Sequence, residues 1–275
     1  MSYGGNFDAF FLSAEPGARF ALYHPAQGPA PRGGIVYVHP FAEEMNKSRR
    51  MAALQARAFA AAGFAVLQLD LYGCGDSAGD FDDARWEIWK QDVFLAASWL
   101  TERVPGPLYV WGLRLGATLA LDAWRERPHR FDAALLWQPV LNGEVFMTQF
   151  LRLAVAGDAL RGGTKSATRD ELHRRLAAGE NVEVGGYALS PALVCAIKRV
   201  KLADCIIPGA VINWLEVGHG KEIPPAVQRV LTNWREMEMR VDYRIVAGDP
   251  FWTTVEIAEA PALISASLEF PEAVQ

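Results

Sequence analysis

The chain has 275 residues, which is long for one compact domain and short for two full ones, so a single core with an inserted segment is expected. Hydrophobic residues make up 51% of the chain and charged residues 21%, a balance that excludes a disordered chain and a coiled coil. The net charge of -5 provides no electrostatic footprint for nucleic acid or for an anionic membrane surface, so neither is expected as a partner.

Short apolar runs alternate along the chain with longer segments of helical periodicity, which is typical of a mostly parallel sheet covered by helices on both faces. The first 25 residues are expected to form an antiparallel hairpin at the edge of the sheet. Later strands are expected at residues 34–39, 64–70, 108–111, 133–137, 210–216 and 242–247. Helices are expected at residues 46–62, 83–104, 117–124, 224–239 and 262–270. Asn46 or Ser48 is the expected cap of the first helix, and Asp82 or Asp83 that of the second.

Between about residues 140 and 207 this alternation lapses into mixed helical pieces, broken at Gly162-Gly163 and Gly185-Gly186. We therefore predict an α/β core formed by residues 1–139 and 208–275. Residues 140–207 are predicted to be an inserted cap, which would set the size of a bound substrate.

Three cysteines, Cys74, Cys195 and Cys205, form neither an even disulfide framework nor a metal-binding pair, which suits a reducing compartment. The first eight residues lack the basic and apolar regions of a signal peptide. No uncharged apolar run reaches the roughly 18 residues that a membrane span needs. We expect a cytoplasmic protein without a membrane span.

A sharp glycine turn, Gly112-Leu113-Arg114-Leu115-Gly116, joins a predicted strand to the helix that follows it. A strand, a tight turn and a helix in this order form the context of the nucleophile elbow, whose pattern is G-x-S-x-G. Small residues flank the tip because the strand and helix backbones approach closely there, and the tip residue itself is held in a strained conformation.

Two further segments accompany this turn. His39-Pro40-Phe41-Ala42-Glu43-Glu44 follows one predicted strand, and Gly73-Cys74-Gly75-Asp76-Ser77 follows the next. On these three segments, the chain from about residue 30 onward resembles the α/β-hydrolase superfamily in its serine aminopeptidase-like branch. More narrowly, it resembles the exosortase A system-associated hydrolase 2 family. The resemblance implies an α/β-hydrolase fold, hydrolysis of ester or thioester (acyl) bonds, and a genomic setting of exopolysaccharide synthesis and exosortase-linked sorting.

The chain departs from this family at the residues that carry the chemistry. Arg114 stands where the superfamily has its nucleophile, and a guanidinium stays protonated and has no lone pair to donate. The superfamily places its catalytic histidine in the loop after the last strand, where this chain has Asp249. The third member would follow the preceding strand, where Glu216 and His219 are available. The triad is therefore degenerate.

The two replacements suggest that Arg114 and Asp249 form an ion pair in place of serine and histidine. Such a pair could simply close the site, because buried ion pairs are weak indicators of function. Alternatively, the helix N-terminus and the guanidinium would together bind an anionic group, with Asp249 as partner or base.

Other groups near the same edge offer alternatives. Cys74 could act as a nucleophile with His39 as its base, or be a small, partly buried loop residue. His39 could carry a proton, or bridge loop backbones. The hydroxyl of Ser77 is expected to satisfy its own loop. His219 lies near the rim of the same edge.

Backbone groups and acidic residues complete the expected site. The N–H groups of Phe41 and Leu115 are the expected oxyanion donors, and they need no particular side chain. Glu43 and Glu44 could serve as acid or base or pair with Arg114, or they could be solvated charges at the start of a helix.

Two functions are compatible with these residues. The chain could hydrolyse esters or thioesters through a rebuilt site, or it could be an inactive pseudohydrolase that binds an anionic acyl ligand or a protein partner. No metal motif occurs, and the glycine loop at residues 73–79 is a weak match to a dinucleotide fingerprint, so no metal and no cofactor are expected. The sequence does not determine the oligomeric state.

Overall fold

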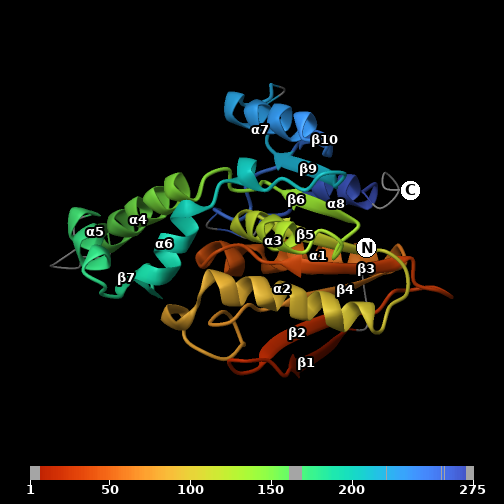
Figure 1. The fold of residues 1–275 in the computed structure, drawn as a ribbon, viewed down its shortest axis with the longest axis horizontal. Coiled ribbons are helices and arrows are strands. Elements are labelled where there is room, and N and C mark those ends of the chain that lie inside the picture. The colour runs from red at the N-terminus through yellow and green to blue at the C-terminus, as the bar shows by residue number, and fades with distance from the viewer. Residues whose placement is uncertain (1–6, 161–168, 221, 255, 257, 271–275) are drawn as a thin grey trace.

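The computed structural model describes residues 7–160, 169–220, 222–254, 256 and 258–270, and an eight-stranded sheet forms its centre (Figure 1). The strands of this sheet, in chain order, are β1 (Asp8–Leu12), β2 (Arg19–His24), β3 (Gly33–Val38), β4 (Phe64–Leu69), β5 (Leu108–Leu113), β6 (Ala133–Trp137), β9 (Val211–Val217) and β10 (Arg240–Val246). Their spatial order is β1-β2-β4-β3-β5-β6-β9-β10.

Strands β3, β4, β5, β6, β9 and β10 run parallel to one another, whereas β1 and β2 form the expected antiparallel hairpin and β2 pairs antiparallel with β4. The carboxyl ends of the parallel strands therefore meet at one edge of the sheet. Ligand sites of open α/β sheets lie at this edge.

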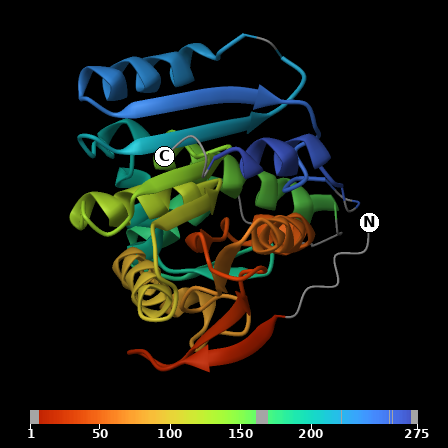
Figure 2. The same ribbon diagram turned by 90° about the vertical axis from the view of Figure 1, so that its right-hand side faces the viewer.

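Helices cover both faces of the sheet. The helices are α1 (Glu43–Ala61), α2 (Trp86–Thr101), α3 (Leu115–Glu126), α4 (Gly143–Leu160), α5 (Arg169–Ala177), α6 (Pro191–Arg199), α7 (Pro225–Glu236) and α8 (Pro261–Leu268). Figure 2 shows α1 and α8 on one face and α2 and α3 on the other. A separate hydrophobic core lies on each face, and all six residues of β3 and of β5 are buried between the two. Continuous apolar runs are what a parallel sheet covered on both faces requires.

Two predicted helix starts are wrong. Helix α1 begins at Glu43 with Ala42 before it, so neither Asn46 nor Ser48 is its cap. Helix α2 begins at Trp86, whereas Asp82 and Asp83 lie in the short 3-10 helix η1 (Phe81–Asp83), which Asp80 caps. Neither helix has a side-chain cap: Ala42 precedes α1, and Arg85 precedes α2 without a capping hydrogen bond.

The elements between β6 and β9 extend beyond the sheet at the left of Figure 1. They include α4, α5, α6, the short 3-10 helix η2 (Leu202–Asp204), and a hairpin of β7 (Val182–Val184) and β8 (Tyr187–Leu189). This hairpin was not predicted, because strands of three residues are too short to show an alternating pattern. Gly185 and Gly186 form its turn with positive φ, whereas Gly162 and Gly163 lie outside the described residues. Among the described helices, none has the length and apolar character needed to cross a membrane.

Candidate active site

Arg114 occupies the tip of the turn between β5 and α3, with φ of 55° and ψ of -121°. A Cβ atom added to Gly112 would lie 2.4 Å from the Cα atom of Ala117, and one added to Gly116 would lie 2.3 Å from the carbonyl oxygen of His39. Only glycine fits at either position. The turn thus has the tight, strained geometry that its glycine spacing predicts.

The Arg114 side chain lies among a carboxylate, a carbonyl and two aromatic rings. Its Nε donates a hydrogen bond to Oε1 of Glu44 at 3.2 Å, and its Nη1 donates to the carbonyl oxygen of Gln138 at 3.4 Å. The guanidinium carbon lies 5.5 Å from the ring centre of Trp252 and 6.0 Å from that of Phe146, within the range of cation–π contact. The side chain is still 20% exposed, so part of it faces solvent.

Glu44 lies in the first turn of α1, which starts after Ala42, a residue with φ of 50°. Burial raises the pKa of Glu44, and the nearby Arg114 guanidinium opposes this effect. The neighbouring Glu43 points to the surface, where its Oε2 accepts a hydrogen bond from the Tyr187 hydroxyl at 3.3 Å. Of the two acidic residues, Glu44 belongs to the site and Glu43 is an exposed charge.

The expected ion pair between Arg114 and Asp249 does not form. Oδ1 of Asp249 lies 3.6 Å from Nε2 of His219, and these two side chains are 72% and 75% exposed. Asp249 therefore pairs with the imidazole that follows β9, because the parallel strands β9 and β10 end side by side. The sequence had offered His219 as a candidate third member of the triad and as a residue of the rim.

Gln138 connects these groups, although it was not among the residues predicted for the site. Its backbone has φ of 45°, its carbonyl oxygen accepts from Arg114, and its Oε1 accepts from the N–H of Val217 at 2.8 Å. The sequence signal that could have identified Gln138 is its position as a polar residue directly after a buried strand. Trp252, which contacts Arg114, lies three residues after Asp249 and was not predicted either.

Glu216 is buried near the end of β9 and accepts a hydrogen bond from the Tyr243 hydroxyl at 3.1 Å. Burial raises the pKa of Glu216, whereas Tyr243 and the positive charge of Arg114 lower it. Arg114 therefore has the carboxylates of both Glu44 and Glu216 in its electrostatic surroundings.

Both ring nitrogens of His39 are occupied by backbone groups. Nε2 accepts a hydrogen bond from the N–H of Leu71 at 3.1 Å, so Nδ1 carries the proton and donates to the carbonyl oxygen of Pro40 at 2.8 Å. Burial lowers the pKa of His39 and favours this neutral form. Of the two predicted roles, the geometry supports the structural bridge between loops, because no lone pair remains to accept a proton.

Cys74 is buried, and burial raises the pKa of its thiol, with Asp70 and Asp92 adding to the effect. A reactive cysteine needs the opposite, a lowered pKa and access to substrate. The cavity beside Cys74 has a volume of about 10 Å³, which holds about one water molecule and no acyl chain. It is lined by apolar side chains and by the elbow, including Phe41, Trp86, Trp89, Leu115 and Leu119.

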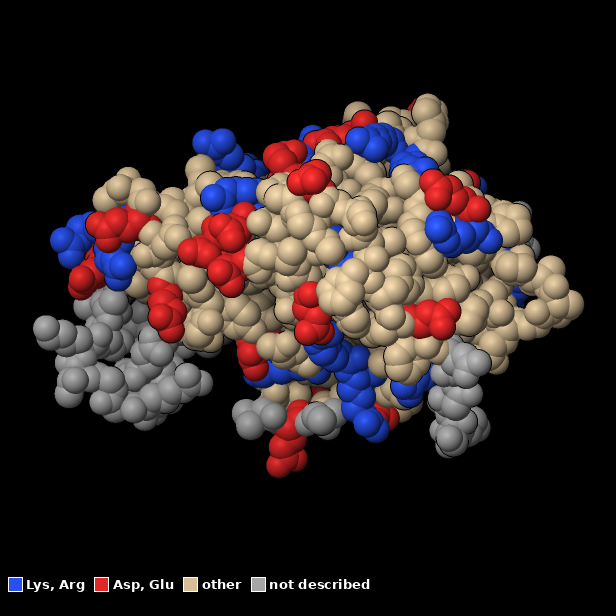
Figure 3. All heavy atoms as spheres, turned by 90° about the horizontal axis from the view of Figure 1, so that it is seen from below, with Lys and Arg blue, Asp and Glu red and all other residues tan. Residues whose placement is uncertain are grey.

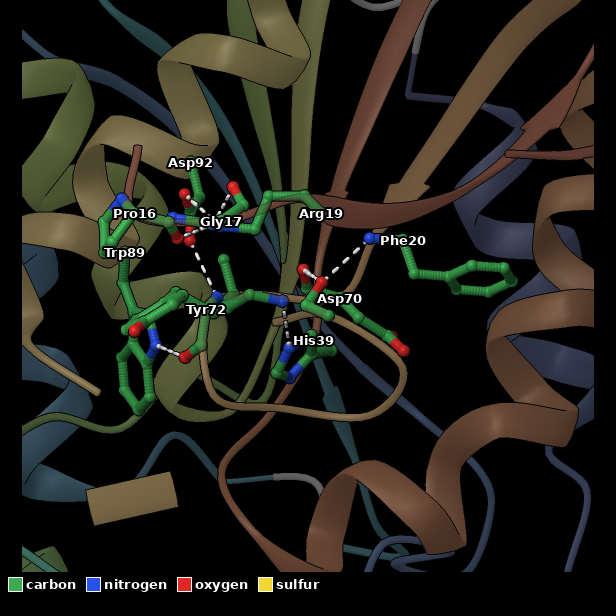
Figure 4. A network of polar contacts seen from close by, with 11 residues as sticks. Pro16, Gly17, Arg19, Phe20, His39, Asp70, Tyr72, Trp89 and Asp92 are labelled. Atoms are coloured by element: carbon green, nitrogen blue, oxygen red, sulfur yellow. Dashed lines mark hydrogen bonds and ion pairs between the residues drawn. The ribbon is translucent and has the colours of Figure 1, made fainter. Parts of the chain in front are cut away.

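Ser77 satisfies its own loop, as expected. Its hydroxyl donates to the carbonyl oxygen of Asp70 and accepts from the N–H of Phe20 at 2.9 Å. These contacts belong to the polar network of Figure 4, which fixes the loop after β4 against β2 and α2.

The centre of that network is the buried ion pair of Arg19 and Asp92, with Nε and Oδ1 2.7 Å apart. Asp92 also accepts from the N–H of Tyr72 at 2.8 Å, and the Tyr72 carbonyl accepts from Nε1 of Trp89 at 2.9 Å (Figure 4). Burial raises the pKa of Asp92 to about 6. The loop that carries Cys74 and Ser77 is thus connected to β2 and α2 by hydrogen bonds and an ion pair.

The two predicted oxyanion donors have suitable backbone positions. Leu115 is the first residue of α3, where N–H groups have no acceptor within the helix. No described residue accepts a hydrogen bond from the N–H of Leu115 or of Phe41.

A further group of acidic side chains lies close together in the segment before α2. The carboxylates of Asp80, Asp82 and Asp83 lie within 4.8 Å of one another, but Asp80 and Asp83 are used in capping η1. On the face shown in Figure 3, the described acidic and basic side chains are interspersed.

Comparison with known proteins places these features in a family. A family model described as serine aminopeptidase, S33, matches residues 29–177. No curated protein matches the chain. The solved structure of Est1E from Butyrivibrio proteoclasticus with bound ferulic acid is similar, with a TM-score of 0.68 and 15% identity over 96% of this chain and 98% of that one.

Two other solved structures are similar over nearly their whole length. A thermostable carboxyl esterase from Bacillus coagulans, in complex with glycerol, has a TM-score of 0.67 and 14% identity over 98% of each chain. Alpha/beta hydrolase domain-containing protein 10 from mouse has a TM-score of 0.58 and 18% identity, and the match covers 98% of this chain and 100% of the mouse chain. The predicted α/β-hydrolase fold is confirmed.

Proposed function

We propose that this chain, which belongs to the serine aminopeptidase (S33) family of α/β-hydrolases, binds the carboxylate of a small acyl compound at Arg114 and forms no covalent acyl-enzyme. The observation that carries the proposal is the position of Arg114 at the tip of the elbow, 20% exposed and beside the first N–H groups of α3. A guanidinium and a helix N-terminus both favour an anion, and neither can attack a carbonyl carbon.

The neighbouring side chains support binding rather than covalent catalysis. The Cys74 thiol is buried, the Ser77 hydroxyl is engaged in its loop, and both ring nitrogens of His39 have backbone partners. None of these three candidates from the sequence combines an attacking atom with a free base.

The aromatic rings at the site favour an acyl or aryl group on the ligand. Trp252 and Phe146 lie beside the Arg114 guanidinium and are only 5% and 7% exposed, so the surroundings of the charge are largely apolar. Est1E, a structural neighbour, binds ferulic acid, which is a carboxylic acid with an aromatic ring. The resemblance to the exosortase A system-associated hydrolase 2 family adds a proposed setting in exopolysaccharide synthesis.

Titration with hexanoate tests the proposal. Wild-type protein is expected to bind hexanoate at least tenfold more tightly than Arg114→Met, because a charge-assisted hydrogen bond contributes about 1.5–3 kcal/mol. Arg103→Met is the matched control, since Arg103 is an arginine on the surface that contacts Trp99 away from the elbow. Equal affinity of the wild type and Arg114→Met overturns the proposal.

A second candidate function is hydrolysis of an acyl compound by water, without a covalent intermediate. It rests on the separation of 3.6 Å between His219 and Asp249, which could make the imidazole a general base. Turnover of p-nitrophenyl butyrate by the wild type that is lost in His219→Asn and kept in Cys74→Ala would favour this candidate. No turnover by the wild type would favour binding alone.

A further inference from the structure

The Arg114 site already contains a carboxylate, that of Glu44. We propose that a ligand carboxylate binds by replacing Glu44 on the Arg114 guanidinium, and that Glu44 takes up one proton as it is displaced. This inference rests on the proposed function. It identifies Glu44 as the residue that sets specificity, and monoanionic carboxylates as the class of ligand.

The contact between the two side chains is one that a ligand can replace. Only Nε of Arg114 and Oε1 of Glu44 are joined, at 3.2 Å, although an arginine and a carboxylate can form two parallel hydrogen bonds. A free carboxylate approaching the exposed side of Arg114 could use both nitrogens of the fork. Breaking the single hydrogen bond between Arg114 and Glu44 therefore costs less free energy than two hydrogen bonds from Arg114 to a ligand carboxylate would provide.

The surroundings of the second carboxylate oxygen of Glu44 favour its protonation. Oε2 is buried, and no described residue donates a hydrogen bond to it. A buried carboxylate oxygen without a donor is costly, and protonation lowers this cost because it removes the buried charge. Burial also raises the pKa of Glu44, in the same direction.

The charges around Glu44 predict that one proton is taken up for each ligand carboxylate that binds. Arg114 faces it from the elbow and Lys47 from the same helix, and Glu216 on β9 faces Arg114. Lys47 donates a hydrogen bond to the carbonyl oxygen of Thr253 at 3.3 Å and keeps its charge, and Arg114 is the cation that acts on both Glu44 and Glu216. A ligand would add another negative charge, and like charges at one site raise the pKa of the more buried group. Protonation of Glu44 restores the balance.

The same charges determine which anion fits. A monocarboxylate with protonation of Glu44 leaves the total charge of the site unchanged. A phosphate ester, with up to two negative charges, would leave an excess that one arginine cannot neutralise. We therefore expect hexanoate to bind at least tenfold more tightly than hexyl phosphate.

The decisive measurement is the number of protons taken up by the wild type. Calorimetric titration with hexanoate at pH 7, in Bis-Tris and in Tris, reports this number from the difference between the two observed enthalpies. We expect close to one proton for each hexanoate bound. Linkage then requires the dissociation constant to rise by up to tenfold for each pH unit above neutrality.

A pair of variants separates charge from shape. Glu44→Gln keeps the size of the side chain and removes its charge, so it is expected to bind hexanoate at least tenfold more tightly at pH 8, without proton uptake. Glu43→Gln is the matched control on the same helical turn, and it is expected to behave like the wild type. The proton count on the wild type decides the proposal even if Glu44→Gln does not fold.

The measurements distinguish a failure of the proposed exchange at Glu44 from a failure of the proposed ligand binding at Arg114. If binding requires Arg114 but takes up no proton, and Glu44→Gln matches the wild type, the exchange is wrong and the proposed function stands. If hexanoate binds equally to the wild type and Arg114→Met, or binds to neither, the proposed function itself fails.

Discussion

The Nε2 atom of His39 accepts a hydrogen bond from the backbone N–H of Leu71, at 3.1 Å. This bond connects the end of β3 to the loop after β4, next to the elbow. His39 is therefore part of the framework of the site. A proton on its Nε2 atom would break the hydrogen bond from Leu71.

Replacement of His39 by Gln is expected to lower the free energy of unfolding by about 1–3 kcal/mol at pH 8, because buried backbone groups lose a partner. It should leave hexanoate binding within twofold of the wild type. Urea denaturation measures the first quantity and calorimetry the second. His129→Gln, at an exposed position, is the control and should change neither.

The pH dependence of stability follows from the same histidine. Burial lowers the pKa of His39 below its ordinary value of 6.5, so the unfolded chain binds a proton more readily than the folded protein. The contribution of neutral His39 to the free energy of unfolding is therefore fully present above pH 6.5, and it is lost progressively as the pH falls below this value. His39→Gln should lose less stability than the wild type between pH 7 and pH 5. Some dependence will remain, since burial also lowers the pKa of His24. An unchanged slope in His39→Gln would contradict the assignment.

Exchange of three residues should create a hydrolase. The triple variant Arg114→Ser, His219→Asp and Asp249→His places a hydroxyl at the elbow and puts the acid after β9 and the histidine after β10. The close approach of His219 and Asp249, at 3.6 Å, indicates that the exchanged pair can still interact. We expect labelling by a fluorophosphonate and turnover of p-nitrophenyl butyrate at least tenfold above Arg114→Ser alone. Wild-type protein should remain unlabelled. Equal labelling of the single and triple variants would show that these two loops do not supply the base.

The cysteines should differ in reactivity. Cys195 is exposed, whereas Cys74 and Cys205 are buried, and burial raises the pKa of Cys205 to about 12. A disulfide reagent such as Ellman's reagent should modify one thiol of the native protein and three after unfolding in guanidinium. Cys195→Ser should abolish the native reaction. Rapid modification of a second thiol in the folded protein would contradict the burial of Cys74.

Gly116 should not tolerate a side chain. The added Cβ of Gly116→Ala would lie 2.3 Å from the carbonyl oxygen of His39, so α3 or the end of β3 must shift. We expect a loss of stability of at least about 1–3 kcal/mol, together with weaker hexanoate binding. Gly218→Ala is the control, because no atom lies within 4 Å of its added Cβ. Thermal denaturation of the two variants provides the comparison.

Much of the architecture could be predicted from local patterns. The order of strands and helices, the N-terminal hairpin and the glycine turn at Arg114 follow from apolar periodicity and from the steric demands of close backbones. The exact starts of α1 and α2 could not be predicted, because neither helix uses a capping side chain and the polar residues nearby gave a misleading signal. The β7–β8 hairpin is too short to leave a periodic signal.

The sequence by itself determined that the elbow has no attacking atom, since a guanidinium lacks a nucleophilic lone pair in any fold. Only the tertiary structure decided what Arg114 contacts, because its partner Glu44 lies 70 positions away in the chain. It also decided that Asp249 pairs with His219 and that His39 is engaged by backbone groups on both nitrogens. Such pairings depend on how the loops after parallel strands meet at one edge of the sheet, and the pattern of any single segment contains no information about that meeting.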